Sequence, residues 1–244
     1  MLQLPYLSLR QSAYKPIWDL QEEILAHDLN IKKINKSSEQ HKSTLSTLIL
    51  CEHLPVYTLG KSGKIENLKL SPEELAEKSI DYYKINRGGD ITYHGPGQIT
   101  GYPVFDLEQL KPSAAWFIDT MESAIIDTLL EFGIKSQRIE GLTGVWVKGA
   151  TEAEDRKLCA IGVKMSRWVS IHGFALNVNT DLSYYDHIIP CGIDDKGVSS
   201  ISKELGREVS IEEVEPVLLK AFQKHFGIQF HSLTLAELNQ QLGS

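Results

Sequence analysis

Cysteine is scarce in this chain of 244 residues, which has only Cys51, Cys159 and Cys191, far apart in the sequence. No two of them form a Cys-x-x-Cys pair, so a disulfide framework is excluded and reduced thiols in a cytoplasm are expected. Long apolar runs are also lacking, since no stretch approaches the roughly 18 apolar residues of a membrane helix. The first residues carry no basic segment followed by an apolar core. We therefore expect a soluble, cytoplasmic protein that is not exported.

Positive charge is in short supply as well. Lysine and arginine number 25 against 32 aspartate and glutamate residues, which gives a formal net charge of −7 and a pI near 5.6. General affinity for nucleic acid or for an anionic membrane needs a basic face, so neither partner is expected. With 42% hydrophobic residues the chain can bury a sizeable core. We expect residues 1–244 to form one domain.

What the chain does contain is a glycine-rich stretch at residues 87–98, with the sequence RGGDITYHGPGQ, between two strand-like segments. Glycine lets a backbone lie directly against a ligand, and Arg87 offers a fork of donors for a phosphate or carbonyl group. The interval from Gly97 to Gly101 does not match a dinucleotide fingerprint, and no Gly-Lys-Ser/Thr opens a helix as in a Walker loop. The stretch indicates a ligand-binding platform, although a wide glycine-rich connection around a buried histidine would give the same pattern.

Cys191 stands between Pro190 and Gly192. Proline stiffens the chain before the thiol, and glycine lets an amide approach a reacting carbonyl group after it, so the thiol is well presented for nucleophilic attack. A small buried hydrophobe is the alternative use of such a cysteine. Several cations could accompany the thiol, and spacing alone does not say which one reaches it: Arg156, Lys157, Lys164 and Arg167.

Strand-like and helix-like patterns along the chain predict an α+β fold. Apolar runs predict strands at residues 2–9, 45–51, 82–86, 144–147, 158–165, 169–171 and 174–178. Ser71 and Ser210 each begin a capping box, and Pro216 is expected to restart or kink the helix after Ser210. Residues 112–133 carry the pattern of the longest helix, which ends at Gly133. Short turns between most strands favour mixed sheets with helices around them.

Several runs of sequence together resemble the lipoyl(octanoyl) transferase family. They are RGGDITYHGPGQ at 87–98 with a later Tyr-Pro, KLCAIG at 157–162, SRWVSIHGFALN at 166–177, PCG at 190–192 and EHLPVYTLG at 52–60. The resemblance runs from about residue 14 to about residue 226. It implies the catalytic domain shared by biotin and lipoate protein ligases, and a transfer of octanoyl groups from acyl carrier protein to apo lipoyl domains. The implied acceptors are the E2 subunits of 2-oxoacid dehydrogenases and the glycine cleavage H protein, and no cofactor is implied.

The resemblance also assigns roles to individual residues. Cys191 matches the position of the nucleophile, and Lys157 matches the position of its lysine partner. An apolar slot that reads the length of the acyl chain is expected beside them. His172, at the expected start of a strand, is either part of this site or a structural histidine. The residues implied to contact the acyl substrate are Arg87, Gly88, Gly89, Asp90, Ile91, Thr92, Tyr93, His94, Ala160, Ile161, Gly162, Gly173, Phe174 and Ala175.

A cysteine and a lysine together suit this reaction. A free thiol has a pKa of about 8.5 and is only a few per cent thiolate at neutral pH, while an adjacent ammonium group stabilises the thiolate. The thiolate of Cys191 would attack the donor thioester and form an acyl-cysteine. Lys157 could then act as an acid in the first half of the reaction and as a base when the acceptor amine attacks.

Other functions remain compatible with these residues. A cysteine hydrolase would use water as the acceptor, an ATP-dependent lipoate ligase would have a related fold, and an inert acyl or lipoyl-domain binding protein would show no turnover. The histidines and Cys191 lack the close spacing of a zinc motif, so no metal is expected. Because acyl carrier proteins are acidic, docking is expected on a basic rim. That rim is drawn from Lys61, Lys64, Lys84, Arg87, Lys164 and Arg167.

Overall fold

The computed structural model describes residues 1–189 and 196–243, and within them the strands form two mixed sheets. The large sheet has nine strands in the order β12-β1-β2-β6-β10-β9-β8-β7, with β11 beside β9, and the small sheet has the order β4-β3-β5. The predicted α+β class with mixed sheets is confirmed. The strands are β1 (Leu2–Ser12), β2 (Thr47–His53), β3 (Val56–Leu59), β4 (Asp81–Lys84), β5 (Ile91–His94), β6 (Gln98–Val104), β7 (Gln137–Ile139), β8 (Leu142–Val147), β9 (Arg156–Ser166), β10 (Val169–Asn177), β11 (Gly197–Val198) and β12 (Ile228–Ser232).

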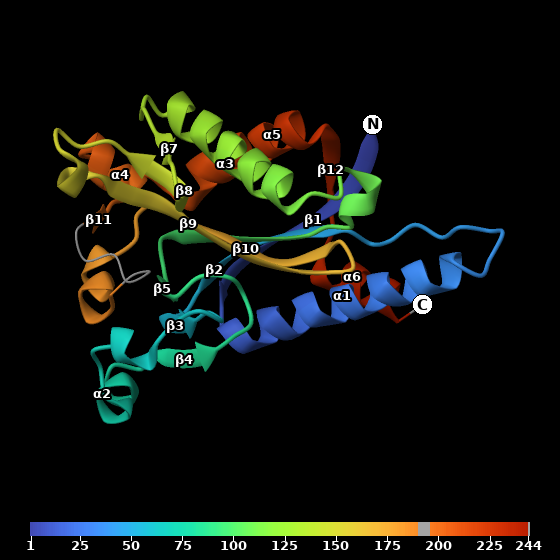
Figure 1. The fold of residues 1–244 in the computed structure, drawn as a ribbon, viewed down its shortest axis with the longest axis horizontal. Coiled ribbons are helices and arrows are strands. Elements are labelled where there is room, and N and C mark those ends of the chain that lie inside the picture. Colours follow the sequence, from blue (N-terminus) through green and yellow to red (C-terminus); the bar gives the residue numbers. More distant parts are fainter. Residues whose placement is uncertain (190–195, 244) are drawn as a thin grey trace.

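Helices pack on both faces of the large sheet (Figure 1). α3 (Ala114–Glu131) and α5 (Ile211–Phe226) cover one face, and α1 (Tyr14–Asn35) and α6 (Leu235–Leu242) cover the other. Because both of its faces are covered, the central strand β10 is buried along its whole length. The small sheet lies beside the first turn of α1, where Tyr14 and Tyr83 stack with ring centroids 5.5 Å apart, and α2 (Pro72–Glu77) packs against β4.

Capping residues set the helix ends much as the sequence predicts. Ser71 and Ser210 form complete capping boxes with Glu74 and Glu213. Gly133 has φ +78° just after α3, the left-handed conformation that a C-terminal cap requires. The prediction that this helix is the longest is wrong, because α1 has 22 residues and α3 has 18.

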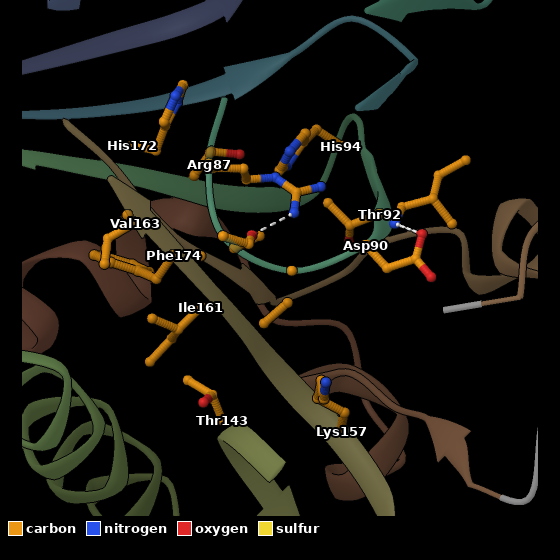
Figure 2. Close-up of a pocket in the computed structure, with 18 of the residues that line it drawn as sticks. Arg87, Asp90, Thr92, His94, Thr143, Lys157, Ile161, Val163, His172 and Phe174 are labelled. Atoms are coloured by element: carbon orange, nitrogen blue, oxygen red, sulfur yellow. Dashed lines mark hydrogen bonds between the residues drawn. The ribbon is translucent and has the colours of Figure 1, made fainter. Parts of the chain in front are cut away.

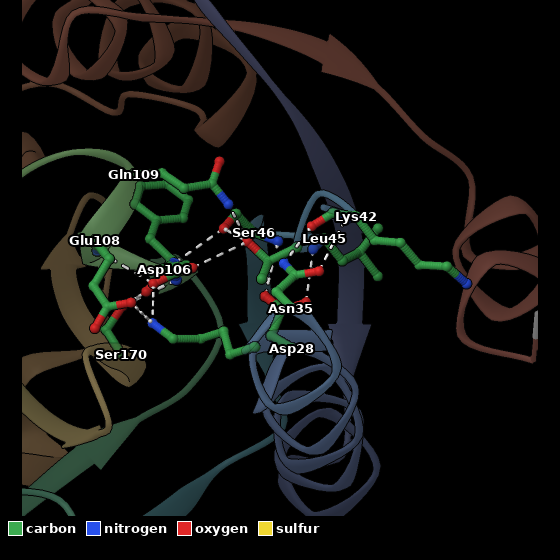
Figure 3. Close-up of polar contacts among 12 residues, drawn as sticks. Asp28, Asn35, Lys42, Leu45, Ser46, Asp106, Glu108, Gln109 and Ser170 are labelled. Atoms are coloured by element: carbon green, nitrogen blue, oxygen red, sulfur yellow. Dashed lines mark hydrogen bonds and ion pairs between the residues drawn. The ribbon is translucent and has the colours of Figure 1, made fainter. Parts of the chain in front are cut away.

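A buried carboxylate explains the extra length of α1 (Figure 3). Asp28 is fully buried and accepts hydrogen bonds from the backbone N–H groups of Leu45, at 2.6 Å, and Ser46, at 3.1 Å. Burial raises the pKa of Asp28, and these hydrogen bonds oppose the rise. One turn further on, Lys32 forms an ion pair with Asp106. Tertiary contacts therefore hold the polar second half of α1 against the start of β2 and the end of β6.

Two elements continue where the sequence predicted a boundary. Pro216 lies within α5, so the helix does not restart there, and the apolar face of α5 packs against α3 strongly enough to offset one lost backbone hydrogen bond. His172 and Gly173, expected at the start of a strand, lie in the middle of β10. His172 has φ +63°, and its N–H turns out of the sheet to Gln21 Oε1 at 3.0 Å.

The segments near the two ends of the described chain lie side by side. β1 pairs in parallel with β12, with Leu2 opposite Ile228 and Tyr6 opposite Ser232. β12 is not predicted from the sequence, although the alternation of apolar and polar residues over residues 228–231 is the signal that could have indicated it. In the part of the chain that the structure describes, every helix is too short or too polar to cross a membrane.

Candidate active site

A cavity of about 420 Å³ lies between the large sheet and the glycine-rich segment 87–92. Strands β9 and β10 form one wall, and further walls come from the β7–β8 turn and the first turn of α1. Figure 2 shows Lys157 at one end of this cavity and His172, Arg87 and His94 at the other. The cavity is therefore elongated and follows β9.

The glycine-rich segment rests directly on β9. The N–H of Gly88 donates to the carbonyl of Val163 at 3.0 Å. A side chain added at Gly162 would place its first carbon 2.8 Å from the carbonyl oxygen of Gly88, and one added at Gly60 would lie 2.3 Å from that of Gly89. Glycine is thus required at Gly162 and Gly60 because two backbones meet there.

Gly162→Ala is therefore expected to lower the free energy of unfolding by about 1–3 kcal/mol, the usual cost of overfilling a packed site. Gly88→Ala is the matched control, since its added carbon would meet only Val163 O at 3.4 Å, and it should change stability by less than about 0.5 kcal/mol. Denaturant unfolding of the two variants measures both values. Equal losses would show that the segment does not rest on Gly162.

Arg87 is buried and directs its guanidinium group into the protein. Nη2 donates to the backbone oxygen of Thr58 at 2.7 Å and to Thr58 Oγ1 at 3.0 Å, and Nη1 donates to the carbonyl of Gly88 at 3.0 Å. The expected place of Arg87 in an exposed basic rim is therefore wrong. The guanidinium group of Arg87 instead holds the glycine-rich segment in shape. Of the other residues predicted for the rim, Lys61, Lys64, Lys84 and Arg167 are exposed.

A chain of hydrogen bonds fixes the tautomer of His94. The side-chain amide of Gln98 donates to the carbonyl of Tyr93 at 3.1 Å, so its oxygen faces His94 Nδ1 at 2.9 Å. Nδ1 therefore carries the proton, and Nε2 accepts from Thr58 Oγ1 at 3.3 Å. Burial, together with the positive charge of Arg87, keeps the pKa of His94 well below its usual range. His94 is thus a neutral, fully oriented ring at the cavity wall.

His172 is the second neutral histidine of this end. Its Nε2 lies 2.9 Å from Asn86 Oδ1, and its Nδ1 is buried with no hydrogen-bond partner among the described residues. Burial lowers the pKa of His172 to about 3, and the nearby charge of Arg87 adds to the effect. His172 lines the cavity and is also hydrogen-bonded within the fold, so its part in the site stays a prediction.

Aromatic residues that the sequence did not single out surround His94. The ring of Tyr14 stacks on that of His94, with centroids 5.9 Å apart, and lies 5.1 Å from the ring of His53. His53 Nε2 is 2.7 Å from the hydroxyl oxygen of Tyr102. Burial lowers the pKa of His53 to about 4 and raises the pKa values of Tyr14 and Tyr102. These side chains come from α1, β2, β5 and β6. Because the four residues are far apart in the sequence, no local sequence pattern predicts the cluster.

The stability of the protein is expected to fall as the pH drops from about 6.5 toward 4. Histidines of the unfolded chain take up protons near pH 6.5, whereas folded His53 and His172, with pKa values of about 4 and about 3, remain neutral. The unfolded state then binds more protons, and each such histidine lowers the free energy of unfolding by up to about 1.4 kcal/mol per pH unit. Denaturant midpoints measured across this range give the slope.

Two variants isolate the contribution of a buried histidine to that slope. His53→Gln should flatten the pH dependence between about 6.5 and 4, because one proton-linked group is removed. His231→Gln changes an exposed histidine and should keep the wild-type slope. Identical slopes for all three proteins would contradict a neutral, buried His53.

The opposite end of the cavity is formed around Lys157. Its Nζ lies over the ring of Trp146, 4.6 Å from the centroid, and its carbonyl accepts from the N–H of Ser199 at 3.0 Å. Leu142 and Thr143 line the same cavity from the β7–β8 turn. A cation held over an indole face is attracted by the ring. The ammonium group of Lys157 is thus positioned at the cavity by neighbouring strands.

Cys191 lies outside the described residues, and the chain that leads toward it is anchored at Ile189. The N–H of Ile189 donates to the carbonyl of Asn67 at 2.8 Å. The side chain of Asn67 in turn donates to the carboxylate of Asp90, which lines the cavity. Asn67 thus connects the chain at Ile189 to Asp90 of the glycine-rich segment.

Thirteen of the predicted substrate-contacting residues line the cavity together with Lys157 and His172, and Tyr93 does not. Tyr93 stacks on Tyr184, with ring centroids 4.5 Å apart, in the core of the small sheet. Of the lining residues that the sequence did not place in the site, Tyr102 belongs to the Tyr-Pro pair and Asn177 to the run at 166–177 that resemble the family, and Tyr14 stands at the start of the resemblance. These additional residues are Tyr14, Thr100, Tyr102, Ile118, Gly141, Leu142, Thr143, Val163, Asn177, Tyr185 and Val198. Among the described residues, no group of three His, Cys, Asp or Glu side chains could hold a metal ion.

The fold that surrounds this cavity is that of the lipoate protein ligases. The bi-partite lipoate protein ligase of Thermoplasma acidophilum superposes with a TM-score of 0.69 at 18% identity, covering 99% of this chain and 91% of that one. A lipoate-protein ligase A bound with ATP gives a TM-score of 0.68 at 18% identity, covering 98% and 92%. These similarities show the fold, and the predicted resemblance to lipoate protein ligases is confirmed.

Sequence comparison gives the family. Residues 14–223 match the lipoyl protein ligase A/B catalytic domain. The octanoyltransferase of Christiangramia forsetii is 51% identical over 214 residues, which cover 87% of this chain and 91% of that protein. The octanoyltransferase of Cytophaga hutchinsonii is 46% identical over 223 residues, 91% of each chain. The chain therefore belongs to the lipoyl protein ligase A/B catalytic-domain family. The predicted resemblance to octanoyltransferases is confirmed, and with it the class of enzyme, an acyltransferase.

Proposed function

We propose that this chain moves an octanoyl group from octanoyl-acyl carrier protein to a lysine of apo lipoyl domains through a thioester on Cys191, in the cytoplasm. Octanoyl transfer in protein lipoylation follows from the octanoyltransferase relatives. The covalent intermediate, the carrier-protein donor and the acceptors, namely E2 subunits of 2-oxoacid dehydrogenases and the glycine cleavage H protein, are proposed in addition. The observation that carries the proposal is the position of Lys157 at one end of an elongated, partly apolar cavity.

The proposed reaction has two halves that share one proton. The thiolate of Cys191 attacks the carbonyl carbon of the donor thioester, and the leaving pantetheine sulfur takes a proton from the ammonium group of Lys157. The neutral amine of the acceptor lysine then attacks the acyl-cysteine, and Lys157 removes a proton from it as the thiolate of Cys191 leaves. The pair of thiolate and ammonium is thereby restored, and no other reactant is consumed.

The apolar part of the cavity suits an acyl chain. Ile118, Leu142, Ile161, Val163 and Phe174 line it, from α3, the start of β8 and the central strands β9 and β10. Each methylene group buried there contributes roughly 0.8 kcal/mol, so an octanoyl chain gains several kcal/mol before the cost of ordering it. The small residues Ala160, Gly162 and Gly173 leave room beside these side chains.

The requirement for ATP separates this proposal from the ligase alternative. The guanidinium group of Arg87 hydrogen-bonds to Thr58 and Gly88 of its own chain, which favours a role in shaping the cavity over a role as a phosphate clamp. Transfer from octanoyl-acyl carrier protein to an apo lipoyl domain is expected without ATP, with the added mass on the domain as the readout. Free octanoate with ATP should give no product. A ligase would give the reverse pattern, and a binding protein would give no product in either reaction.

A further inference from the structure

The end of the cavity remote from Lys157 is polar, although an apolar slot is expected for an aliphatic chain. Figure 2 shows His172, Arg87 and His94 there, with Ile161 and Phe174 between them and Lys157. We call this end the polar chamber. It is lined by Tyr14, Arg87, His94, Thr100, Tyr102 and His172.

The cavity is longer than an octanoyl group. Lys157 and Val163 are six positions apart on β9, a distance of about 20 Å at roughly 3.3 Å per residue. With carbon–carbon bonds of about 1.5 Å, an octanoyl chain spans at most about 11 Å. An octanoyl chain attached beside Lys157 therefore ends before the polar chamber. A twelve-carbon chain with a terminal hydroxyl group spans up to about 18 Å and, with a hydrogen bond of about 2.8 Å, reaches it.

Among the described residues of the polar chamber, hydrogen-bonding capacity is left at His172 Nδ1, which is shielded from solvent, and at the hydroxyl group of Tyr14. His94 bonds to Gln98 and Thr58, the hydroxyl of Tyr102 lies 2.7 Å from His53, and Thr100 donates to Gln98 at 3.2 Å. The hydroxyl of Tyr14 has no hydrogen-bond partner within residues 1–189 and 196–243, yet Tyr14 is only 2% exposed and lines the cavity. Burial also raises the pKa of this phenol, so it stays protonated and able to donate.

We propose that the polar chamber selects among acyl groups by the chemistry of their far end. Acyl chains longer than octanoyl acylate the enzyme fastest when they end in a hydroxyl group that hydrogen-bonds to Tyr14. This inference rests on the proposed function, because it needs the acyl carbonyl group beside Lys157. An aliphatic tail in the chamber would cover polar groups without bonding to them. A terminal hydroxyl group can accept the proton of Tyr14, whereas a hydroxyl group in mid-chain would be buried between Ile161 and Phe174. The additional substrate class is therefore ω-hydroxylated medium-chain acyl thioesters.

The test measures the rate at which small acyl-pantetheine thioesters acylate the enzyme, followed by intact mass spectrometry. Wild-type protein should react about tenfold faster with 12-hydroxydodecanoyl than with dodecanoyl or 6-hydroxydodecanoyl thioester, as one buried hydrogen bond allows. Tyr14→Phe should bring the ratio of 12-hydroxydodecanoyl to dodecanoyl close to one. Tyr83→Phe is the matched control, since Tyr83 stacks on Tyr14 outside the cavity, and it should keep the wild-type ratio.

The outcomes separate this inference from the proposed function. A wild-type ratio near one, or a ratio that Tyr14→Phe leaves unchanged, overturns the inference while octanoyl transfer stands. The comparison of the two hydroxydodecanoyl isomers on the wild-type enzyme decides the matter even if Tyr14→Phe does not fold. If the octanoyl thioester itself leaves no adduct, the proposed function is overturned, and the inference with it.

Discussion

Cys191→Ala is expected to lower the rate of octanoyl transfer by about 10⁴-fold or more, the size of loss seen when a covalent nucleophile is removed. Without the thiol, the acceptor amine would have to attack the carrier thioester directly, and no acyl-enzyme would divide the reaction into two easier steps. Single-turnover transfer from octanoyl-acyl carrier protein to an apo lipoyl domain measures the effect.

Cys159→Ala is the matched control for this variant. Cys159 is fully buried in the core beside Leu158 and does not line the cavity. Its replacement should cost roughly 1 kcal/mol of stability, the usual loss for a core substitution of this size, and should leave the transfer rate near that of the wild type. A Cys191→Ala protein that kept more than about a tenth of the wild-type rate would be incompatible with an obligatory nucleophile.

Lys157→Ala is expected to slow formation of the octanoyl-enzyme by about 10²- to 10⁴-fold at neutral pH, the range typical of a lost acid–base group. Without the neighbouring ammonium group, the thiol should ionise near its ordinary pKa of about 8.5. The rate should therefore recover partly as the pH rises through that value, because more thiolate forms unaided. Rapid-quench kinetics with a small octanoyl thioester, from about pH 6.5 to 9.5, give the profile.

Lys148→Ala provides the control for the loss of a lysine. Lys148 is exposed just after β8 and is not among the residues that line the cavity. The Lys148→Ala variant should retain the wild-type rate of octanoyl-enzyme formation and its pH profile. If Lys157→Ala matched the wild type across the whole pH range, the assignment of Lys157 as the partner of the thiol would be wrong, although covalent transfer could still take place.

Local chemistry allowed much of the fold to be predicted. Ser71 and Ser210 mark helix starts because each side chain caps its own helix, and Gly133 marks a helix end because few other residues adopt a positive φ. The glycine-rich segment stands out in the sequence for a similar reason, and in the structure its backbone at Gly88 comes close to Gly162. Each of these features depends on residues close in sequence or on a family motif.

Features that depend on long-range packing could not be predicted in the same way. The length of α1 depends on Asp28, whose partners lie 17 and 18 positions away along the chain. The cluster of Tyr14, His53, His94 and Tyr102 forms only when four separate elements meet. The polar character of the remote end of the cavity follows from this cluster, so the sequence predicted only an apolar slot there.

Intact mass spectrometry of the enzyme after mixing with octanoyl-acyl carrier protein, and with no acceptor present, tests covalent transfer most directly. We predict a single octanoyl adduct that maps to Cys191, is released by hydroxylamine as a thioester should be, and moves to a lysine when an apo lipoyl domain is added. Full transfer activity with no adduct on the enzyme, or an adduct on another residue that is passed to the acceptor, would contradict a thioester intermediate on Cys191.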